Sequence, residues 1–169
     1  MESMSEDEPL HVIMGPICSE KTTKLIDSMI YRAKHNIPAL LVTHPFIHCG
    51  PNRVVSRTNR IVSKANGSCK EVSEDDLMKV HSLVEYHDSK AILIDEAQLF
   101  DGLLRFVEYA LCDNKEVFVF GDDTSLYGEL NALLPFADNA VKCMGVCDQC
   151  SHKSIRATCE YIHPTEYRV

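Results

Sequence analysis

The segment that most constrains the fold of this chain is a short loop that reads GPICSEKT from Gly15 to Thr22. It follows an apolar run, Leu10–Met14, and precedes residues 22–33, where apolar side chains recur at helical spacing. Three residues fit the phosphate-binding pattern G-x-x-x-x-G-K-[ST], namely Gly15, Lys21 and Thr22. Glu20 occupies the place of the second glycine. The sequence therefore predicts a strand, a phosphate-binding loop and a helix, with one residue that departs from the motif.

The rest of the chain continues the alternation of strands and helices. Further strands are expected at 39–42, 91–94 and 117–120, and helices after Ser73 and at 103–111. Prolines and glycines make residues 44–70 read as irregular, with a short strand around 60–63. Buried strands that alternate with helices predict an α/β fold, a P-loop NTPase-like parallel sheet with helices on both faces.

We expect one main domain with a small segment at each end. Residues 1–9 read as a disordered acidic tail, 10–142 as the α/β domain, and 143–169 as a short, Cys-containing, zinc-ribbon-like tail. The first residues lack the basic and apolar regions of a secretion signal. Since no apolar run approaches the ~18 residues of a spanning helix, we expect no membrane segment.

A second motif is an apolar strand that ends in two acids. Residues 92–100 read ILIDEAQLF, which places Asp95 and Glu96 directly after the strand. In this arrangement Asp95 orients Mg²⁺ through water and Glu96 is free to act as a base, while Lys21 meets the phosphates of ATP and Thr22 the Mg²⁺. The alternative is an acidic N-cap for the helix that follows.

A cysteine cluster lies near the C-terminus. Cys147 and Cys150 form a C-x-x-C pair, which is half of a tetrahedral zinc site. Cys159 and His163 are the nearest candidates for the other half, and Cys143 and His152 are further ones. The alternative is that the second half is missing and the thiols are idle. Eight cysteines without a secretion signal favour a reducing, cytoplasmic compartment.

The charge of the chain is uneven. The net charge of −8 argues against a surface that coats nucleic acid broadly. Between residues 28 and 70, however, there is no Asp or Glu and there are seven cations, namely Arg32, Lys34, Arg53, Arg57, Arg60, Lys64 and Lys70. This segment is either a solvated face beside a phosphate site or a docking surface for a polyanion such as RNA or the ribosome.

Taken together, these motifs resemble the type II, cellular and poxviral, thymidine kinases over residues 10–159. GPICSEKTTKL is similar to that family's GPMFSGKSTEL, and ILIDEAQLF to its IGIDEGQFF. Ser56-Arg57 is similar to a short S-R motif between them. The segment 128–138 resembles the one that precedes the family's zinc ribbon, and VCDQC lies where the first zinc half-site does.

The resemblance implies ATP-dependent transfer of the γ-phosphoryl group to the 5′-hydroxyl of thymidine. In that scheme Lys21, Thr22 and Asp95 handle ATP and Mg²⁺, with Gly15 and Arg57 also in the nucleotide site, and Glu96 is the base. Catalysis of this kind consists mainly of positioning and charge neutralisation. The family often forms homo-oligomers.

Four departures from the family pattern argue against catalysis. A Glu20 carboxylate about 4 Å from a phosphate costs about 4 kcal/mol at an effective dielectric of about 20, which is roughly a thousandfold in ATP affinity; it either turns to solvent or pairs with Lys21. The acid of a D-x-R motif is replaced in Pro51-Asn52-Arg53. The family's T-F-Q-R-K-P-F run after Asp123 is shortened. The chain ends at Val169, without the loop that closes over thymine and carries the second zinc half-site.

The sequence therefore predicts a thymidine-kinase-like protein that is catalytically inactive and serves as a binding or regulatory subunit, with a protein partner or a second copy of itself. An active ATP-dependent thymidine kinase is the first alternative, because Lys21, Thr22, Asp95 and Glu96 all remain. An RNA- or ribosome-associated factor that uses the 28–70 segment is the second.

Overall fold

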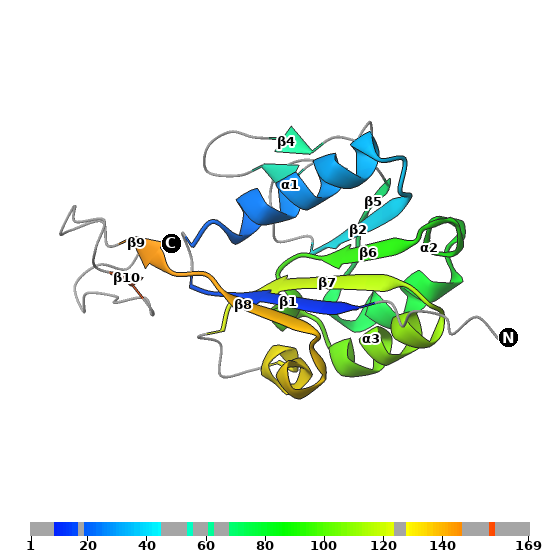
Figure 1. The fold of residues 1–169 in the computed structure, drawn as a ribbon. Coiled ribbons are helices and arrows are strands. Elements are labelled where there is room, and N and C mark those ends of the chain that lie inside the picture. Colours follow the sequence, from blue (N-terminus) through cyan, green and yellow to red (C-terminus); the bar gives the residue numbers. More distant parts are fainter. Residues whose placement is uncertain are drawn as a thin grey trace, which may run out of the picture.

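A computed structural model describes residues 9–16, 19–44, 54–55, 61–62, 68–123, 128–146 and 156–157. Its centre is a six-stranded sheet in the order β5-β2-β6-β7-β1-β8, in which every neighbouring pair is parallel (Figure 1). The strands are β1 (Leu10–Met14), β2 (Ala39–Thr43), β5 (Ser68–Glu71), β6 (Ala91–Ile94), β7 (Glu116–Gly121) and β8 (Asn139–Lys142). The predicted α/β fold with a parallel sheet is confirmed.

The inner strands form where the sequence is continuously apolar. All five residues of β2 and all four of β6 are buried, as expected for parallel strands covered on both faces. The four strands predicted from apolar runs, β1, β2, β6 and β7, have observed bounds within one residue of those expected. Hydrophobic burial therefore fixes the middle of the sheet.

Helices cover both faces of the sheet, as predicted. Helix α1 (Lys21–Lys34) lies on one face and α3 (Leu103–Cys112) on the other (Figure 1). Leu25, Ile26 and Met29 of α1 join one buried cluster. Leu103, Phe106 and Val107 of α3 join a second. The remaining helical elements are η2 (Glu74–Ser82), α2 (Val84–Asp88), η3 (Ala97–Leu99) and η4 (Leu130–Phe136).

Two edge strands differ from the expectation or were not anticipated. Residues 68–70, predicted as irregular, belong to β5, and β8 pairs with β1 beyond the last predicted strand. The short pairs β3 (Val54–Val55) with β4 (Ile61–Val62), and β9 (Gly145–Val146) with β10 (Arg156–Ala157), are antiparallel. β4 confirms the short strand expected around residues 60–63.

The helix expected after Ser73 forms, but as a 3₁₀ helix without a side-chain cap. Ser73 lies at the N-cap position in an extended conformation, and its side chain caps no backbone N–H. Its hydroxyl instead donates to the Asp76 carboxylate at 3.2 Å. The Asp76 carboxylate is thus engaged by the Ser73 hydroxyl, and this helix begins without a side-chain cap.

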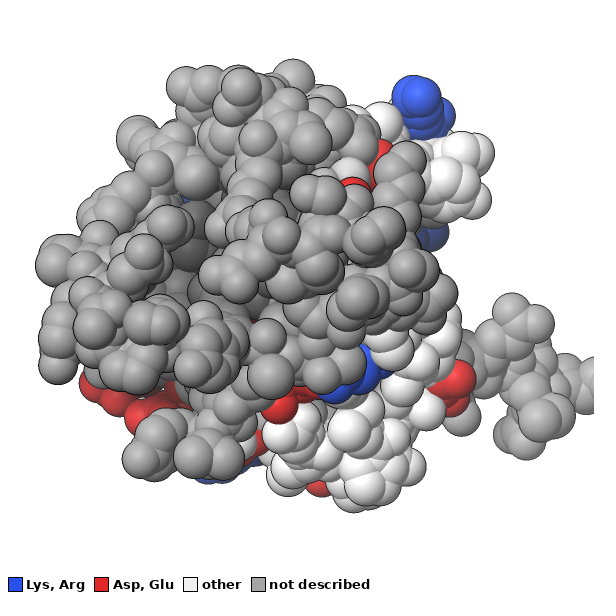
Figure 2. Space-filling model, turned by 90° about the vertical axis from the view of Figure 1, so that its left-hand side faces the viewer, with Lys and Arg blue, Asp and Glu red and all other residues white. Residues whose placement is uncertain are grey.

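The parallel strands give the sheet two chemically different edges. The strands' carboxyl ends lie at the left of Figure 1, where α1 begins, and this side faces the viewer in Figure 2. Side chains of both charges from the described residues reach the surface there (Figure 2). No helix in the described ranges is long and apolar enough to cross a membrane.

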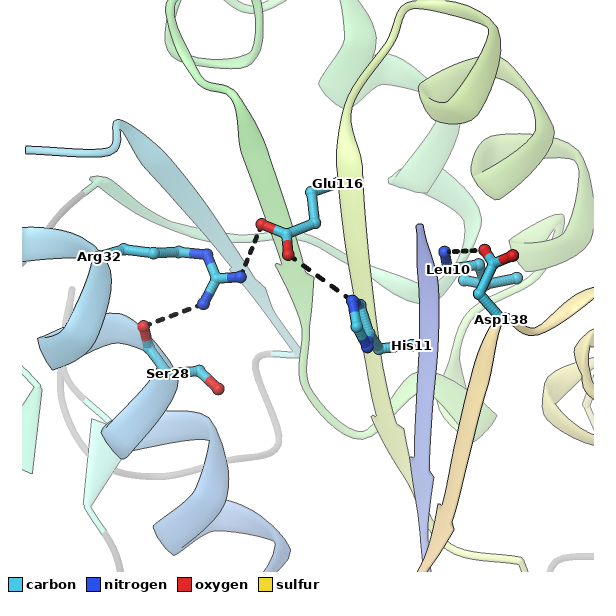
Figure 3. A network of polar contacts seen from close by, with 6 residues as sticks. All are labelled: Leu10, His11, Ser28, Arg32, Glu116 and Asp138. Carbon is cyan, nitrogen blue, oxygen red and sulfur yellow. Dashed lines mark hydrogen bonds and ion pairs between the residues drawn. The ribbon is translucent and has the colours of Figure 1, made fainter. Parts of the chain in front are cut away.

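The amino-end edge carries a network of polar contacts (Figure 3). Arg32 of α1 pairs with Glu116 at the start of β7, with 2.7 Å between Nη2 and Oε2. Its guanidinium also lies 4.0 Å from the centre of the Phe118 ring. Asp138 accepts a 2.7 Å hydrogen bond from the Leu10 amide and so holds the end of β8 to β1. These contacts fasten α1 to β7 and the start of β8 to β1.

His11 belongs to the same network. Its ring stacks on Phe118 with centroids 4.2 Å apart and planes within 3°, and its Nε2 lies 3.6 Å from a Glu116 carboxylate oxygen. Burial lowers the pKa of the His11 imidazole below its ordinary value, while the Glu116 charge acts in the opposite direction. The imidazole is therefore held mainly in its neutral form.

Candidate functional site

The carboxyl-end edge gathers the motif residues that the sequence separates. The loop follows β1, Asp95 follows β6 and Asp122 follows β7. The Gly15 amide donates to the Gly121 carbonyl at 3.2 Å, which ties the loop to the end of β7. Ligands of open α/β sheets bind at this edge, so it is the candidate functional site.

Lys21 spans the loop from the first residue of α1. It is buried, and its ammonium group donates to the carbonyl oxygens of Gly15 at 2.6 Å and Pro16 at 2.7 Å. The Ser19 hydroxyl lies 3.3 Å away. Among the described residues no carboxylate forms an ion pair with this ammonium. Within the described part of the loop, its charge is thus held by neutral oxygens.

Thr22 follows at the second position of α1 and is half-buried. Its place in the first turn puts it beside the positive end of the helix dipole. The structure therefore brings Lys21 and Thr22 together at the start of α1, as the motif predicts.

Glu20, the residue that departs from the motif, adopts a glycine-like backbone conformation. Its φ of 64° and ψ of 17° lie in the left-handed region, and its side chain is exposed. A residue with a Cβ pays roughly 1–2 kcal/mol there, whereas glycine does not. Glu20 therefore holds a backbone conformation that favours glycine, the residue that the motif has at this position.

Gly15 begins the loop where another backbone comes very close. A Cβ at this position would overlap the carbonyl oxygen of Cys143 and lie 2.7 Å from the Ser19 hydroxyl. Cys143 is buried, and its amide donates to the Met14 carbonyl at 2.6 Å. Only glycine fits between this backbone and the loop.

Asp95 and Glu96 lie at the end of β6, next to the loop. Asp95 is buried, and one of its carboxylate oxygens accepts the Glu96 amide at 3.0 Å. Burial, reinforced by the Glu96 charge, raises the pKa of Asp95 to about 7, although the Glu96 amide and the Lys21 charge act against this. The site thus holds a carboxyl group that lacks enough positive charge around it.

Gln98 connects the two acidic strand ends, and the sequence analysis did not assign it a role. Its Nε2 donates to a Glu96 carboxylate oxygen at 2.5 Å, and its Oε1 accepts the Asp122 amide at 2.9 Å. The signal available in the sequence was its position two residues after Glu96 in ILIDEAQLF. Its partner at residue 122 could not be inferred from that spacing.

Asp123 and Lys142 form an ion pair at the same edge, which was also missed. The Asp123 side chain is almost fully buried, and its Oδ1 is buried without a hydrogen-bond partner. The pair joins the ends of β7 and β8, the strands on either side of β1. It adds both an acid and a cation to the surroundings of the loop.

Several predicted site residues lie outside the described residues, namely Arg57, Cys147, Cys150, Cys159 and His163. Within the described ranges, no group of three or more His, Cys, Asp or Glu side chains is arranged to hold a metal. The zinc site therefore stays a prediction, as does the role of Arg57.

The basic segment is partly neutralised by acids from elsewhere in the fold. Arg32 pairs with Glu116, and Lys70 pairs with Glu85 at 2.6 Å. Arg53, Arg60 and Lys64 lie outside the described residues. Two of the seven cations are thus paired with acids of the domain, and the docking surface stays a prediction.

A parallel sheet with a loop of the phosphate-binding pattern after its first strand and an acidic pair after a nearby strand is consistent with the P-loop class of nucleotide-binding folds. A family model described as thymidine kinase matches residues 8–161. Because that match spans most of the sequence, the chain belongs to the thymidine kinase family.

Individual relatives agree with the family match. A thymidine kinase of Mycoplasma mobile is 28% identical over 152 residues, which covers 86% of this chain and 72% of the relative. A thymidine kinase of rabbit fibroma virus is 28% identical over 148 residues, 83% of this chain and 76% of the relative. Thymidine kinase a of Arabidopsis thaliana is 30% identical over 167 residues, 89% of this chain and 66% of the relative. The similarity thus extends across the described sheet.

Proposed function

We propose that this protein binds ATP with Mg²⁺ weakly at the loop, and that phosphoryl transfer is held back by Glu20, so that it acts as a binding or regulatory subunit. One observation carries the proposal. Lys21 is buried in the loop with neutral oxygens as partners, while the residue before it is a strained, charged glutamate. The loop keeps its lysine but gains a charge that repels phosphate.

The residues of the site fit MgATP. Among the described residues the Lys21 ammonium donates to carbonyl and hydroxyl oxygens, neutral partners that phosphate oxygens would replace. Asp95 and Thr22 would hold Mg²⁺, and the raised pKa of Asp95 indicates a carboxyl group that a nearby cation would stabilise in its charged form. Bound Mg²⁺ would supply positive charge against the phosphates.

Glu20 carries two separable energetic costs, of which only the charge bears on binding. Its left-handed backbone costs about 1 kcal/mol relative to glycine. Its carboxylate adds negative charge beside the bound phosphates, which costs more the less it is screened by water. The backbone cost is present with or without nucleotide, so the charge is the larger obstacle to binding.

The test is a titration of the protein with ATP in the presence of Mg²⁺ by isothermal calorimetry. We expect Glu20→Gly to bind ATP at least about tenfold more tightly than the wild type. Glu20→Gln is the matched control, because it keeps the Cβ and removes the charge, and it should recover most of the gain. Lys21→Met should abolish binding in the Glu20→Gly protein. Equal affinity of Glu20→Gly and the wild type would contradict the proposal.

The second candidate function is an active ATP-dependent thymidine kinase. The observation that favours it is the contact between Gln98 and Glu96, which holds the candidate base in one orientation. In this reaction the 5′-hydroxyl gives its proton to Glu96, its oxygen bonds to the γ-phosphorus, and ADP leaves with the electrons of the broken bond. Thymidine-dependent ATP turnover by the wild-type protein that Glu96→Gln abolishes would establish this candidate.

The zinc site, self-association and a cytoplasmic location belong to the same proposal. Metal analysis should find one zinc per chain that Cys147→Ser removes, because a tetrahedral site does not survive the loss of one thiolate. Light scattering should give the mass of a homo-oligomer. A metal content unaffected by Cys147→Ser would remove zinc from the proposal.

A further inference from the structure

Gln98 lies between the candidate base and the neighbouring strand end. It is part of η3, two residues after Glu96, whose φ of 49° puts it in the left-handed region. Its amide reaches the Glu96 carboxylate at 2.5 Å on one side and the Asp122 amide at 2.9 Å on the other. The side chain therefore bridges the ends of β6 and β7.

The chemistry of the two partners fixes which way the Gln98 amide points. A backbone N–H can only donate, so the Asp122 amide requires the Gln98 oxygen opposite it. The nitrogen must then face Glu96, and an ionised carboxylate can only accept. Asp122 thus orients a donor toward the Glu96 carboxylate, and the opposite orientation would lose both hydrogen bonds.

Gly121, next to the Gln98 bridge, is independent evidence that the local packing leaves room for the Gln98 side chain. A Cβ at Gly121 would lie 2.8 Å from the Gln98 Oε1 and 2.6 Å from the Leu130 Cδ2. Both distances are too short for ordinary packing, so a side chain at 121 would move Gln98 or Leu130. The end of β7 is shaped to receive the glutamine.

We propose that Gln98 is a positioning residue that holds the Glu96 carboxylate in the orientation needed to accept the substrate hydroxyl proton. The proposal rests on the proposed function, in which Glu96 is the base of a transfer step that Glu20 holds back. Glu96 occupies a strained backbone conformation and is half-buried. A charge-assisted hydrogen bond from Gln98 limits its rotamers, and Asp122 fixes Gln98 in turn.

Two substitutions separate positioning from a merely structural role, and both are measured in the Glu20→Gly protein with thymidine as acceptor. Gln98→Glu keeps the acceptor for the Asp122 amide but replaces the donor toward Glu96 with a carboxylate. Gln98→Leu removes both contacts. We expect each to lower kcat by about tenfold to a hundredfold, the range of general-base effects, with KM for ATP changed less than about threefold.

A purely structural bridge predicts a different result. Gln98→Glu would then keep nearly all of the activity, because its bond to Asp122 survives, and Gln98→Leu alone would lose it. A further check is Gln98→Leu combined with Glu96→Gln, where the second substitution should add almost nothing. Additive losses, or full activity in Gln98→Glu, would overturn the assignment.

If the Glu20→Gly protein is inactive, that result counts against the proposed function alone. The positioning role of Gln98 is then tested by a measurement that needs no turnover. The chain contains only two glutamines, Gln98 and Gln149, so selective ¹⁵N labelling gives two side-chain amide signals, and Gln98→Leu assigns them. We expect one Gln98 amide proton to exchange with water about tenfold more slowly than those of Gln149, and Glu96→Ala to remove that protection. An unprotected Gln98 amide in the wild-type protein would reject the positioning role.

Discussion

The amino-end edge and the carboxyl-end edge differ in how their buried charges are balanced. At the amino-end edge the Arg32 guanidinium has a carboxylate at 2.7 Å, and His11 is kept neutral. At the carboxyl-end edge the described partners of Lys21 are neutral oxygens, and the pKa of Asp95 is raised to about 7. Charges at the amino-end edge are balanced by its own residues, although Nε of Arg32 and Nε2 of His11 are buried without a hydrogen-bond partner. At the carboxyl-end edge Asp123 pairs with Lys142, whereas Lys21 and Asp95 have no ion pair among the described residues and would be balanced by a ligand that brings charge.

Backbone strain follows the same division. Four residues other than glycine have positive φ within the described part of the chain. Asn36 and Asn114 lie in turns after α1 and α3, where asparagine tolerates this conformation. Glu20 and Glu96 lie in the candidate site. Strain that persists in non-glycine residues is concentrated where function is expected.

The largest effect should come from neutralising Asp95. The native state holds this proton up to about pH 7, whereas the unfolded state releases it near pH 4, so stability falls as the pH rises between those values. Asp95→Asn should therefore raise the free energy of unfolding of the nucleotide-free protein at pH 8 by up to about 4 kcal/mol. Urea unfolding at pH 8 and pH 4 checks this.

At pH 4 most of the gain from Asp95→Asn should vanish, because the native state of the wild type then holds the proton and the unfolded state is about half protonated. Equal gains in the free energy of unfolding at pH 8 and pH 4 would show that the charge of the Asp95 carboxylate does not destabilise the native state. The contrast between the two edges would then lose its clearest element.

The next largest effect should be at the opposite edge. Arg32→Met leaves the Glu116 carboxylate without its guanidinium and should lower the free energy of unfolding by about 3 kcal/mol. Arg105→Ala is the matched control, because Arg105 is exposed and lies 5.7 Å from the Tyr109 ring centre, so its loss should cost under about 0.5 kcal/mol. If Arg32→Met and Arg105→Ala lower the free energy of unfolding by similar amounts, the polar network adds no stability beyond that of a surface side chain.

A smaller effect should follow from relieving the strain at Glu20. Glu20→Gly should stabilise the protein by about 1 kcal/mol, measured as a shift in thermal midpoint, because glycine adopts φ 64° without a Cβ clash. Asn114→Gly is the control and should change stability less, since asparagine is better suited to φ 54°. If Asn114→Gly gives the larger gain, the loop is not a strained segment.

The smallest effect should come from His11. Because burial lowers the pKa of His11, the unfolded state takes up a proton first as the pH falls through about 6.5, and stability drops. His11→Gln stays neutral and should flatten this part of the stability profile between pH 7 and pH 5. A profile that is unchanged by the substitution would place the titrating group elsewhere.

The sequence predicted the inner strands of the sheet but not its two outer strands, for a physical reason. Strands β2 and β6 are buried on both faces and read as apolar runs. β5 reads SCKE and β8 reads NAVK, and both lie at the edge of the sheet, where side chains reach water. Polar edge strands give no hydrophobic signal, so only their pairing identifies them.

The sequence predicted the residues of the candidate site but not the contacts between them. Lys21, Asp95 and Glu96 follow from two local motifs, each contained in a few consecutive residues. The bridge from Gln98 to Asp122 joins residues 24 positions apart, and the pair of Asp123 with Lys142 joins residues 19 apart. Such contacts depend on strand order, which local patterns do not determine.

The close approach of the Cys143 backbone to Gly15 couples the segment after β8 to the loop after β1. The backbone at Cys143 fills the space where a side chain at residue 15 would lie, and its amide bonds the residue before the loop. A shortened chain that stopped before Cys143 would keep every residue of both motifs and still lose one wall of its phosphate loop. During evolution, changes in the segment that follows β8 are therefore constrained by a loop more than a hundred positions earlier.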